Sequence, residues 1–198
     1  MVPSVSKKSG RLKAVMLLKR FRSNRDGVTA VEFGLVAMPF LLFAIGTMAI
    51  GLQFFTINAL DFAVEKASRK IRTGQAQRAN MSLGEFKSLI CESGGDYIEK
   101  DCDNIRVHVQ NSNGWAGMAP TSCASNGQMT QQSNTTASLA DSSGGAEQVV
   151  LVTVCYDWQM PLSLPYLNYM LMRPADNVPL QSGGSLIQSV ATFRNENF

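Results

Sequence analysis

The fold of this chain is decided by the stretch Arg25-Asp26-Gly27-Val28-Thr29-Ala30-Val31-Glu32-Phe33. A basic N-terminal segment ends at Gly27, and the apolar run that follows carries one carboxylate, Glu32, at the fifth position after that glycine. The next 20 residues, 33–52, contain no charged side chain. About 20 apolar residues allow a helix to cross a bilayer. We therefore expect one membrane-spanning helix, and an ionisable group at the edge of such a helix is a functional-site hypothesis.

The charges of the chain are divided sharply at Gly27. Eight of the 18 Lys and Arg residues precede it, and Asp26 is the only acid there. From Val28 onward the chain has 10 basic and 14 acidic residues, a net charge of −4. This excess of acid argues against a nucleic-acid-binding surface, which needs positive charge. The basic leader predicts instead that the N-terminus stays in the cytoplasm and the C-terminal part lies outside it.

The apolar run has two other possible interpretations. A cleaved secretory signal has an apolar core of about 7–15 residues followed by small residues, and this run is longer. A plain signal anchor would keep its leader, and anchoring does not require a glutamate at the edge of the span. The combination of a basic leader, Gly27 and Glu32 favours a processed membrane protein.

The sequence Gly27-Val-Thr-Ala-Val-Glu-Phe-Gly resembles the junction of leader and helix in type IV-like prepilins. Among these it is most similar to the TadE/TadG branch of tight-adherence (Tad) pilus pseudopilins. The segments Val152-Thr-Val-Cys-Tyr-Asp-Trp and Ala191-Thr-Phe-Arg-Asn-Glu are similar to the distal strands of that family. The resemblance implies that a membrane-embedded aspartyl prepilin peptidase cuts between Gly27 and Val28. It also implies that Glu32 is needed for processing or for register in assembly.

The resemblance implies a set of partners and a location as well. The partners are the prepilin peptidase, the major pilin and other pseudopilins, the pilus platform membrane proteins and the lipid bilayer. The expected location is the inner membrane, with a single pass and a periplasmic C-terminal domain, or the pilus and cell surface after assembly. The chain is longer than the short, mostly helical major subunits of that system, so the resemblance implies the role of a minor subunit.

The carboxylate of Glu32 has two candidate partners after cleavage. The new α-amino group of Val28 is positively charged below a pKa of about 8. It lies four residues before Glu32, so the two groups of one helix can meet. The glutamate of one subunit can also neutralise the terminus of another, which is what the resemblance implies. The simplest alternative is an acid placed near a helix start by the helix dipole.

The sequence predicts an α+β fold in three parts. Residues 1–27 form the basic leader, residues 28–72 the spanning helix with an amphipathic extension, and residues 73–198 an extracytoplasmic domain. Pro39 is expected to kink the helix or loosen one turn. The extension shows apolar residues at steps of three and four. This seam packs either on the chain's own domain or on neighbouring subunits; its members are Ile57, Leu60, Val64, Ala67 and Ile71.

The domain is expected to contain one short helix and a small, mostly antiparallel sheet. Ser82 and Glu85 have the spacing of a capping box, which predicts a helix over residues 83–92. Alternating residues predict strands over 105–110, 147–159 and 186–194, the middle one buried on both faces. Two further segments are expected to be irregular: the polar stretch 111–143, tethered by Cys123, and the apolar stretch 161–172, a short helix or a loop.

Four cysteines lie beyond the span: Cys91, Cys102, Cys123 and Cys155. An oxidising compartment favours two disulfides, for which three connectivities exist. Closure of the shorter loops favours Cys91–Cys102 with Cys123–Cys155. Zinc ligation is the alternative, but there is no C-x-x-C, and the only histidine, His108, lies in a strand pattern.

No catalytic constellation is recognisable in the sequence, so we expect neither an enzyme nor a cofactor or metal site. His108 would have to serve any Ser-His or Cys-His arrangement, and its neighbours Val107 and Val109 indicate an ordinary strand position. The acids around Asp103 are typical of a solvated turn. The leading hypothesis is a minor pseudopilin of a Tad-type pilus used in adherence. The alternatives are a single-span anchored module that binds or senses a ligand, and an extracytoplasmic enzyme.

Overall fold

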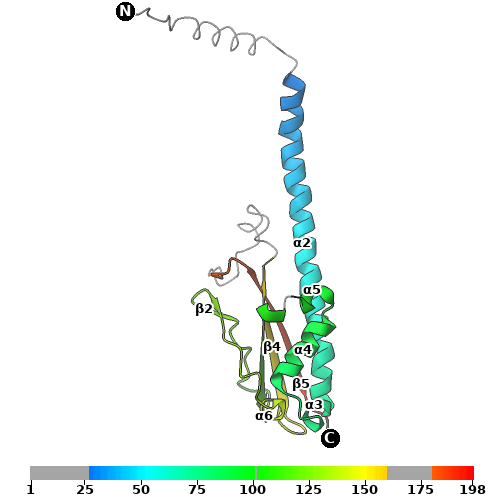
Figure 1. Ribbon diagram of the computed structural model, residues 1–198, viewed down its shortest axis with the longest axis vertical. Helices are drawn as coiled ribbons and strands as arrows, with labels where there is room; N and C mark the ends of the chain where they lie inside the picture. Colours follow the sequence, from blue (N-terminus) through cyan, green and yellow to red (C-terminus); the bar gives the residue numbers. More distant parts are fainter. Residues whose placement is uncertain (1–26, 101, 160–179) are drawn as a thin grey trace, which may run out of the picture. The chain divides into compact units, whose positions relative to one another are not determined.

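The computed structural model of the chain describes residues 27–100, 102–159 and 180–198 (Figure 1). The expected leader and the apolar stretch 161–172 lie outside the described residues. The elements follow the order α2 (Val28–Arg72), α3 (Gln75–Arg78), α4 (Leu83–Ser93), α5 (Asp96–Glu99), η1 (Cys102–Asn104), β1 (Ile105–Ser112), β2 (Ala124–Ser125), β3 (Gln128–Met129), α6 (Leu139–Ser143), β4 (Val149–Trp158) and β5 (Ser185–Arg194).

Helix α2 has the bounds that the sequence predicts, Val28–Arg72, and its 45 residues correspond to about 68 Å at 1.5 Å per residue. It runs through Pro39 without interruption. The chain forms two compact units that divide between Met48 and Ala49, so α2 contributes to both. In the last turn Arg69, Lys70 and Arg72 place positive charge at the negative end of the helix dipole.

The end of α2 is joined to the end of the chain. The backbone N–H of Glu196 donates to the carbonyl of Arg72 at 2.9 Å. Gly74 stops the helix with φ 71°, a conformation that favours glycine. A Cβ at this position would lie 2.3 Å from the Phe198 ring, so the contact also requires a residue without a side chain. The C-terminus consequently lies beside the C-terminal end of α2 (Figure 1).

The three predicted strands form one antiparallel sheet in the order β1-β4-β5. Val107 of β1 lies opposite Val154 of β4, which in turn lies opposite Ser189 of β5. Strand β4 is buried along its whole length, which confirms the prediction of a central strand covered on both faces. The α+β class is therefore confirmed: one long helix, short helices and a small antiparallel sheet.

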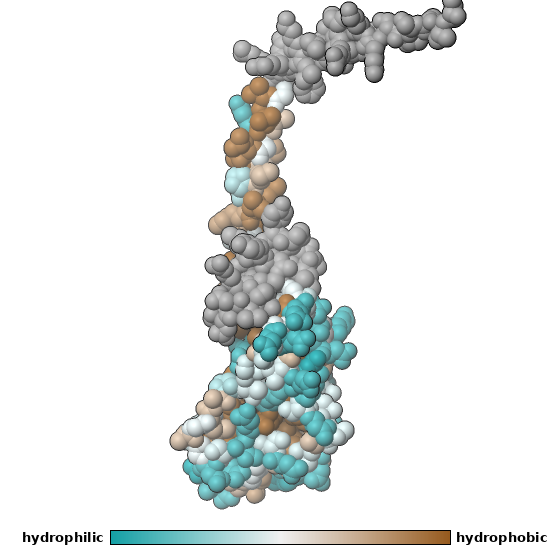
Figure 2. All heavy atoms as spheres, turned by 90° about the vertical axis from the view of Figure 1, so that its left-hand side faces the viewer, coloured by the Kyte–Doolittle hydropathy of each residue, from teal (hydrophilic) through white to brown (hydrophobic). Residues whose placement is uncertain are grey.

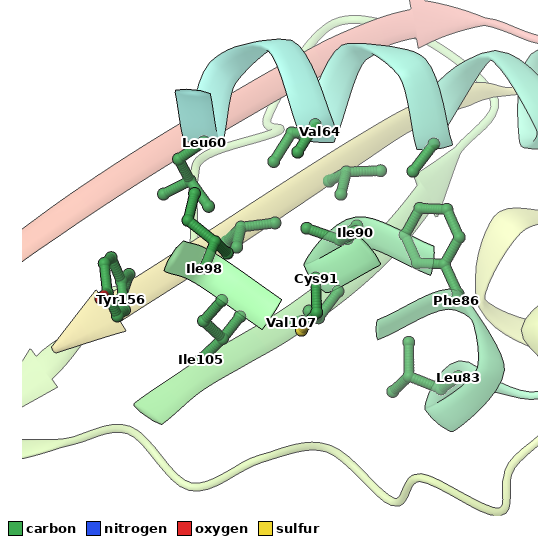
Figure 3. Close-up of a cluster of buried hydrophobic side chains, with 14 of the residues drawn as sticks. Leu60, Val64, Leu83, Phe86, Ile90, Cys91, Ile98, Ile105, Val107 and Tyr156 are labelled. Atoms are coloured by element: carbon green, nitrogen blue, oxygen red, sulfur yellow. The ribbon is translucent and has the colours of Figure 1, made fainter. Parts of the chain in front are cut away.

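The hydrophobic core lies between the sheet and the helices α2 and α4 (Figure 3). Leu60, Val64, Ala67 and Ile71 of the predicted seam are 0 or 1% exposed. Of the two destinations that the sequence allowed for this seam, the structure shows the chain's own domain. The residues that meet it from the other elements include Phe86, Ile90, Ile105, Val107, Val152, Val154 and Tyr156.

Helix α4 begins where the capping-box spacing predicts. The backbone N–H of Glu85 donates to Oγ of Ser82 at 3.2 Å, and the N–H of Ser82 donates to Oε2 of Glu85 at 2.7 Å. The bond from the Ser82 N–H lowers the pKa of the Glu85 carboxyl most, and the Ser82 hydroxyl, which donates to the same Oε2 at 3.0 Å, lowers it further. A disulfide between Cys91 and Cys102 joins α4 to the turn before β1.

The polar stretch 111–143 is more ordered than the sequence indicated. It contains the β2–β3 hairpin, which lies on the sheet face opposite α2 (Figure 1), and helix α6, whose Leu139 joins the core cluster. Cys123 tethers this stretch as expected, through its disulfide to Cys155, but side-chain hydrogen bonds hold the stretch as well. The side chain of Gln132 donates to the carbonyl of Val107 at 2.8 Å and accepts from its N–H at 3.0 Å, as a neighbouring strand would. Thr121 bonds to both Gln110 and Thr153.

The disulfides Cys91–Cys102 and Cys123–Cys155 are the pair that the sequence favoured, with Cα–Cα distances of 5.7 and 5.5 Å. They should stabilise the domain unequally. Their sequence separations are 11 and 32 residues, and in the chain-entropy account these loops correspond to about 3 and about 4 kcal/mol. Replacing each pair with alanines should therefore lower the denaturant midpoint more for Cys123–Cys155. Equal midpoints would show that native-state strain or residual structure outweighs loop length.

Candidate functional site: the start of helix α2

The bond expected to be cut lies at the first turn of α2. Gly27 is the exposed turn residue before the helix, and its carbonyl accepts from the N–H of Val31 at 3.1 Å. A Cβ added to Gly27 would meet no atom within 4 Å. The chain's own described packing therefore does not require glycine here. Recognition of an extended backbone by a peptidase would require it, because a residue without a side chain enters such a site most easily.

The residues after Gly27 expose apolar side chains along the helix (Figure 2). An 18-residue window of α2 has a mean hydropathy of 2.2, and none of it is buried within the chain. Large residues such as Phe33, Leu35 and Phe43 are 72 to 74% exposed. A helix with apolar side chains on every side is stable only inside a bilayer or against other helices. This one N-terminal helix is thus compatible with single-pass anchoring.

Glu32 lies in the second turn of α2, one turn after Val28, and is exposed. Its carboxylate makes no hydrogen bond or ion pair with another described residue. In the uncut chain the nitrogen of Val28 is an uncharged amide, so the group that the sequence proposed as partner forms only on cleavage. The structure places the two positions of the predicted pair one helical turn apart, at the spacing where side chains of one helix can interact. Pairing within a chain and pairing between chains both fit this geometry.

His108 occupies the ordinary strand position that its neighbours predict. It is 7% exposed, on the sheet face covered by the polar stretch, with Nδ1 3.1 Å from Oγ of Ser133. Burial is the main reason that its pKa lies below the usual value, and repulsion by Arg106 adds to this. No group of three or more His, Cys, Asp or Glu side chains that could hold a metal ion occurs among the described residues.

The lowered pKa of His108 predicts an acid-sensitive domain. The folded state binds fewer protons at this site than the unfolded state, so the site's contribution is present above the unfolded pKa of about 6.5. That contribution is lost as the pH falls through 6.5 toward the lower folded pKa. The thermal midpoint should fall more between pH 7 and pH 5 in the natural chain than in His108→Gln. Parallel pH profiles for the two proteins would show that His108 does not contribute.

The comparisons with known proteins address the same end of the chain. Residues 27–69 match the family model described as TadE-like protein, which is about a fifth of the chain. The comparison with curated proteins gives no significant match, and neither does the comparison with solved structures. The family match indicates involvement in a Tad pilus. It begins at Gly27 and includes Glu32 and the whole uncharged run, so the N-terminal segment of this chain is similar to TadE-like proteins.

Proposed function

We propose that this chain is a minor pseudopilin that enters or initiates a Tad-type pilus used in adherence. In this proposal a prepilin peptidase cuts it after Gly27. Helix α2 then holds it in the inner membrane, with the C-terminal domain in the periplasm. Its partners are the major pilin, other pseudopilins and the platform proteins of the pilus. Its role is structural, so neither a cofactor nor a catalytic site belongs to it.

The observation that carries the proposal is the order of features at the start of α2. An exposed glycine is followed at once by a helix, a carboxylate stands one turn in, and 20 uncharged residues come next. A simple anchor needs only the last of these. Cleavage after Gly27 would create a positive amine beside the carboxylate of Glu32. Two opposite charges in a medium of low dielectric constant attract strongly, and each is costly when unpaired.

The distribution of charge supports the orientation. The eight basic residues before Gly27 favour the cytoplasmic side. The two disulfides lie in the other unit, and such bonds persist in oxidising compartments such as the periplasm. With the cut on the cytoplasmic side, α2 stays in the product and the domain remains anchored until assembly.

N-terminal sequencing of the protein extracted from membranes tests the proposal. The expected first residue is Val28. A start at Met1 or Val2 would remove processing and would favour a single-span binding or sensing module. Gly27→Val should prevent cleavage, and Gly34→Val serves as its control. A Cβ at either position meets no atom within 4 Å in the chain. A defect at Gly27 alone would therefore reflect recognition by the peptidase rather than folding.

A further inference from the structure

Part of α2 beyond the span exposes both aromatic and charged side chains. We call the outer α2 face the set Phe55, Asp61, Phe62, Glu65, Arg69 and Arg72. Phe55 is 65% and Phe62 62% exposed, although both belong to the unit with the hydrophobic core. Phe62 stands ten residues after Leu52, about 15 Å along the helix axis. Contact with lipid around the uncharged run therefore does not account for its exposure.

An open groove adjoins this face. Its volume is about 930 Å³, and it lies between α2 and the edge strand β5. Five residues of the outer α2 face line it, together with residues 189–193 of β5. The opposite edge of the sheet, strand β1, differs. There the side chain of Gln132 forms hydrogen bonds with both the N–H and the carbonyl of Val107. The groove thus combines an exposed aromatic ring with charged walls on a surface that no described segment covers.

The charges of the outer α2 face are ordered along the helix. The acids Asp61 and Glu65 come first, and the bases Arg69 and Arg72 follow. The exposed base Lys66, directly after Glu65, also lines the groove, and in the arrangement below it lies level with an uncharged residue. Arg72 makes an exposed ion pair with Glu196 at 3.1 Å. Asp61, Glu65 and Arg69 make no ion pair with another described residue. Acid followed by base on one face is the pattern of a surface that is complementary to a shifted copy of itself.

Copies that are anchored in one membrane by the same helix point in the same direction. In exact register, each charge of one copy would face its equal in the next, which is destabilising. A shift of seven residues changes this. Glu65 then lies level with Arg72 of the neighbour, and Phe55 lies level with its Phe62. Asp61 comes within one residue of the neighbour's Arg69.

The shift of seven residues is two helical turns, about 11 Å. All three pairings require the same direction of shift, and no two like-charged residues of the outer α2 face lie level in this arrangement. The Phe55 ring of one copy is then placed beside the neighbour's groove, which Phe62 lines. Aromatic residues packed at the centre of an interface with charges around them are typical of binding hot spots.

From this pattern we infer that the outer α2 face and its groove dock a second copy of this chain, parallel and displaced by about two helical turns. The inference rests on the proposed function, which anchors both copies in one membrane. It assigns to the external half of α2 a contact between subunits, in addition to the seam that the chain buries within itself. It concerns residues 55–72 alone and makes no use of Glu32.

Photo-crosslinking in membranes tests the docking. The full chain carries p-benzoylphenylalanine in place of Phe62 or, as a control, in place of Trp115, which is 60% exposed. The Phe62 probe should yield a dimer of this chain, with the attachment mapped to residues 54–58 of the second copy. The Trp115 probe should yield at least fivefold less dimer. A Phe62 probe that links to residue 62 of the partner, or only to a different protein, would overturn the inference.

Charge exchange tests the shift. Glu65→Arg and Arg72→Glu should each lower the dimer yield about threefold, since exposed ion pairs are individually weak and reversal adds repulsion. The two changes together recreate opposite charges between neighbours, and the yield should return to within about twofold. Glu92→Arg, an exposed acid on α4, is the matched control and should have no effect. Single variants that crosslink like the natural chain would overturn the pairing.

The N-terminal sequence of the same membrane samples separates the two proposals. A chain that starts at Val28 but gives no mapped dimer would overturn the docking and leave the pilus function standing. A chain that keeps Met1 and still forms the displaced dimer would overturn the proposed pseudopilin function and support the docking of the outer α2 face.

Discussion

Glu32→Leu is expected to abolish pilus assembly while the external domain remains folded. The side chain is exposed on α2, where no described residue depends on it. In the proposed fibre it neutralises the amine of a processed Val28. An unpaired ion in low dielectric costs several kcal/mol, which corresponds to a loss of more than about 100-fold in the assembly equilibrium. The measurement is the number of pili per cell, or surface attachment, in bacteria that carry the variant.

Three controls make the Glu32 result interpretable. Glu32→Gln keeps the size of the side chain and removes its charge, so it should behave like leucine. Glu92→Leu removes an exposed acid from α4 and should leave piliation unchanged. N-terminal sequencing of Glu32→Leu distinguishes a defect in cleavage from a defect in assembly. Normal piliation in Glu32→Leu would show that Glu32 is only an acid favoured near the helix start by the helix dipole. It would also favour the anchored binding module.

The second large effect is expected in the core. Val64→Asp should unfold the external domain, because Val64 is 1% exposed between α2 and the sheet. An isolated buried carboxylate costs several kcal/mol, and a domain's whole stability is about 5–15 kcal/mol. Limited proteolysis of the full chain in detergent should show that residues 49–198 have become sensitive.

Lys66→Asp is the matched control for Val64→Asp. It introduces the same side chain two residues later, at an exposed position of the same helix. It should leave the protease-resistant fragment intact. If Val64→Asp were as resistant as the natural chain, the seam of α2 would not be packed on the domain.

The elements that were predicted correctly depend on residues close in sequence. Helix α2 follows from a long apolar run that continues as a seam with steps of three and four. Helix α4 follows from Ser82 and Glu85, which cap it three residues apart. The central strand β4 follows from apolar residues on both of its faces. In each case local periodicity or spacing carries the information.

The polar stretch 111–143 shows where such reasoning stops. Its order depends on hydrogen bonds to strands far away in the chain, such as those from Gln132 to Val107 and from Thr121 to Thr153. Nothing in the composition of a Ser-, Asn- and Gln-rich segment indicates which of its amides will cap a strand. The cysteine spacing likewise allowed three connectivities, and the structure brings Cys123 to Cys155 through the folding of the sheet.

The sequence by itself determined the long apolar helix that could span a membrane, the place of Glu32 in it and the α+β class, because each depends on composition or on neighbours within a few turns. The expected cut after Gly27 comes from the resemblance to prepilins and stays a prediction. Only the tertiary structure decided that the seam of α2 packs on the chain's own sheet, and that Asp61 and residues near Phe193 line one groove. Those contacts join residues that are tens of positions apart, and more than 100 for Asp61 and Phe193, and the position of the groove depends on the register of β5 beside β4.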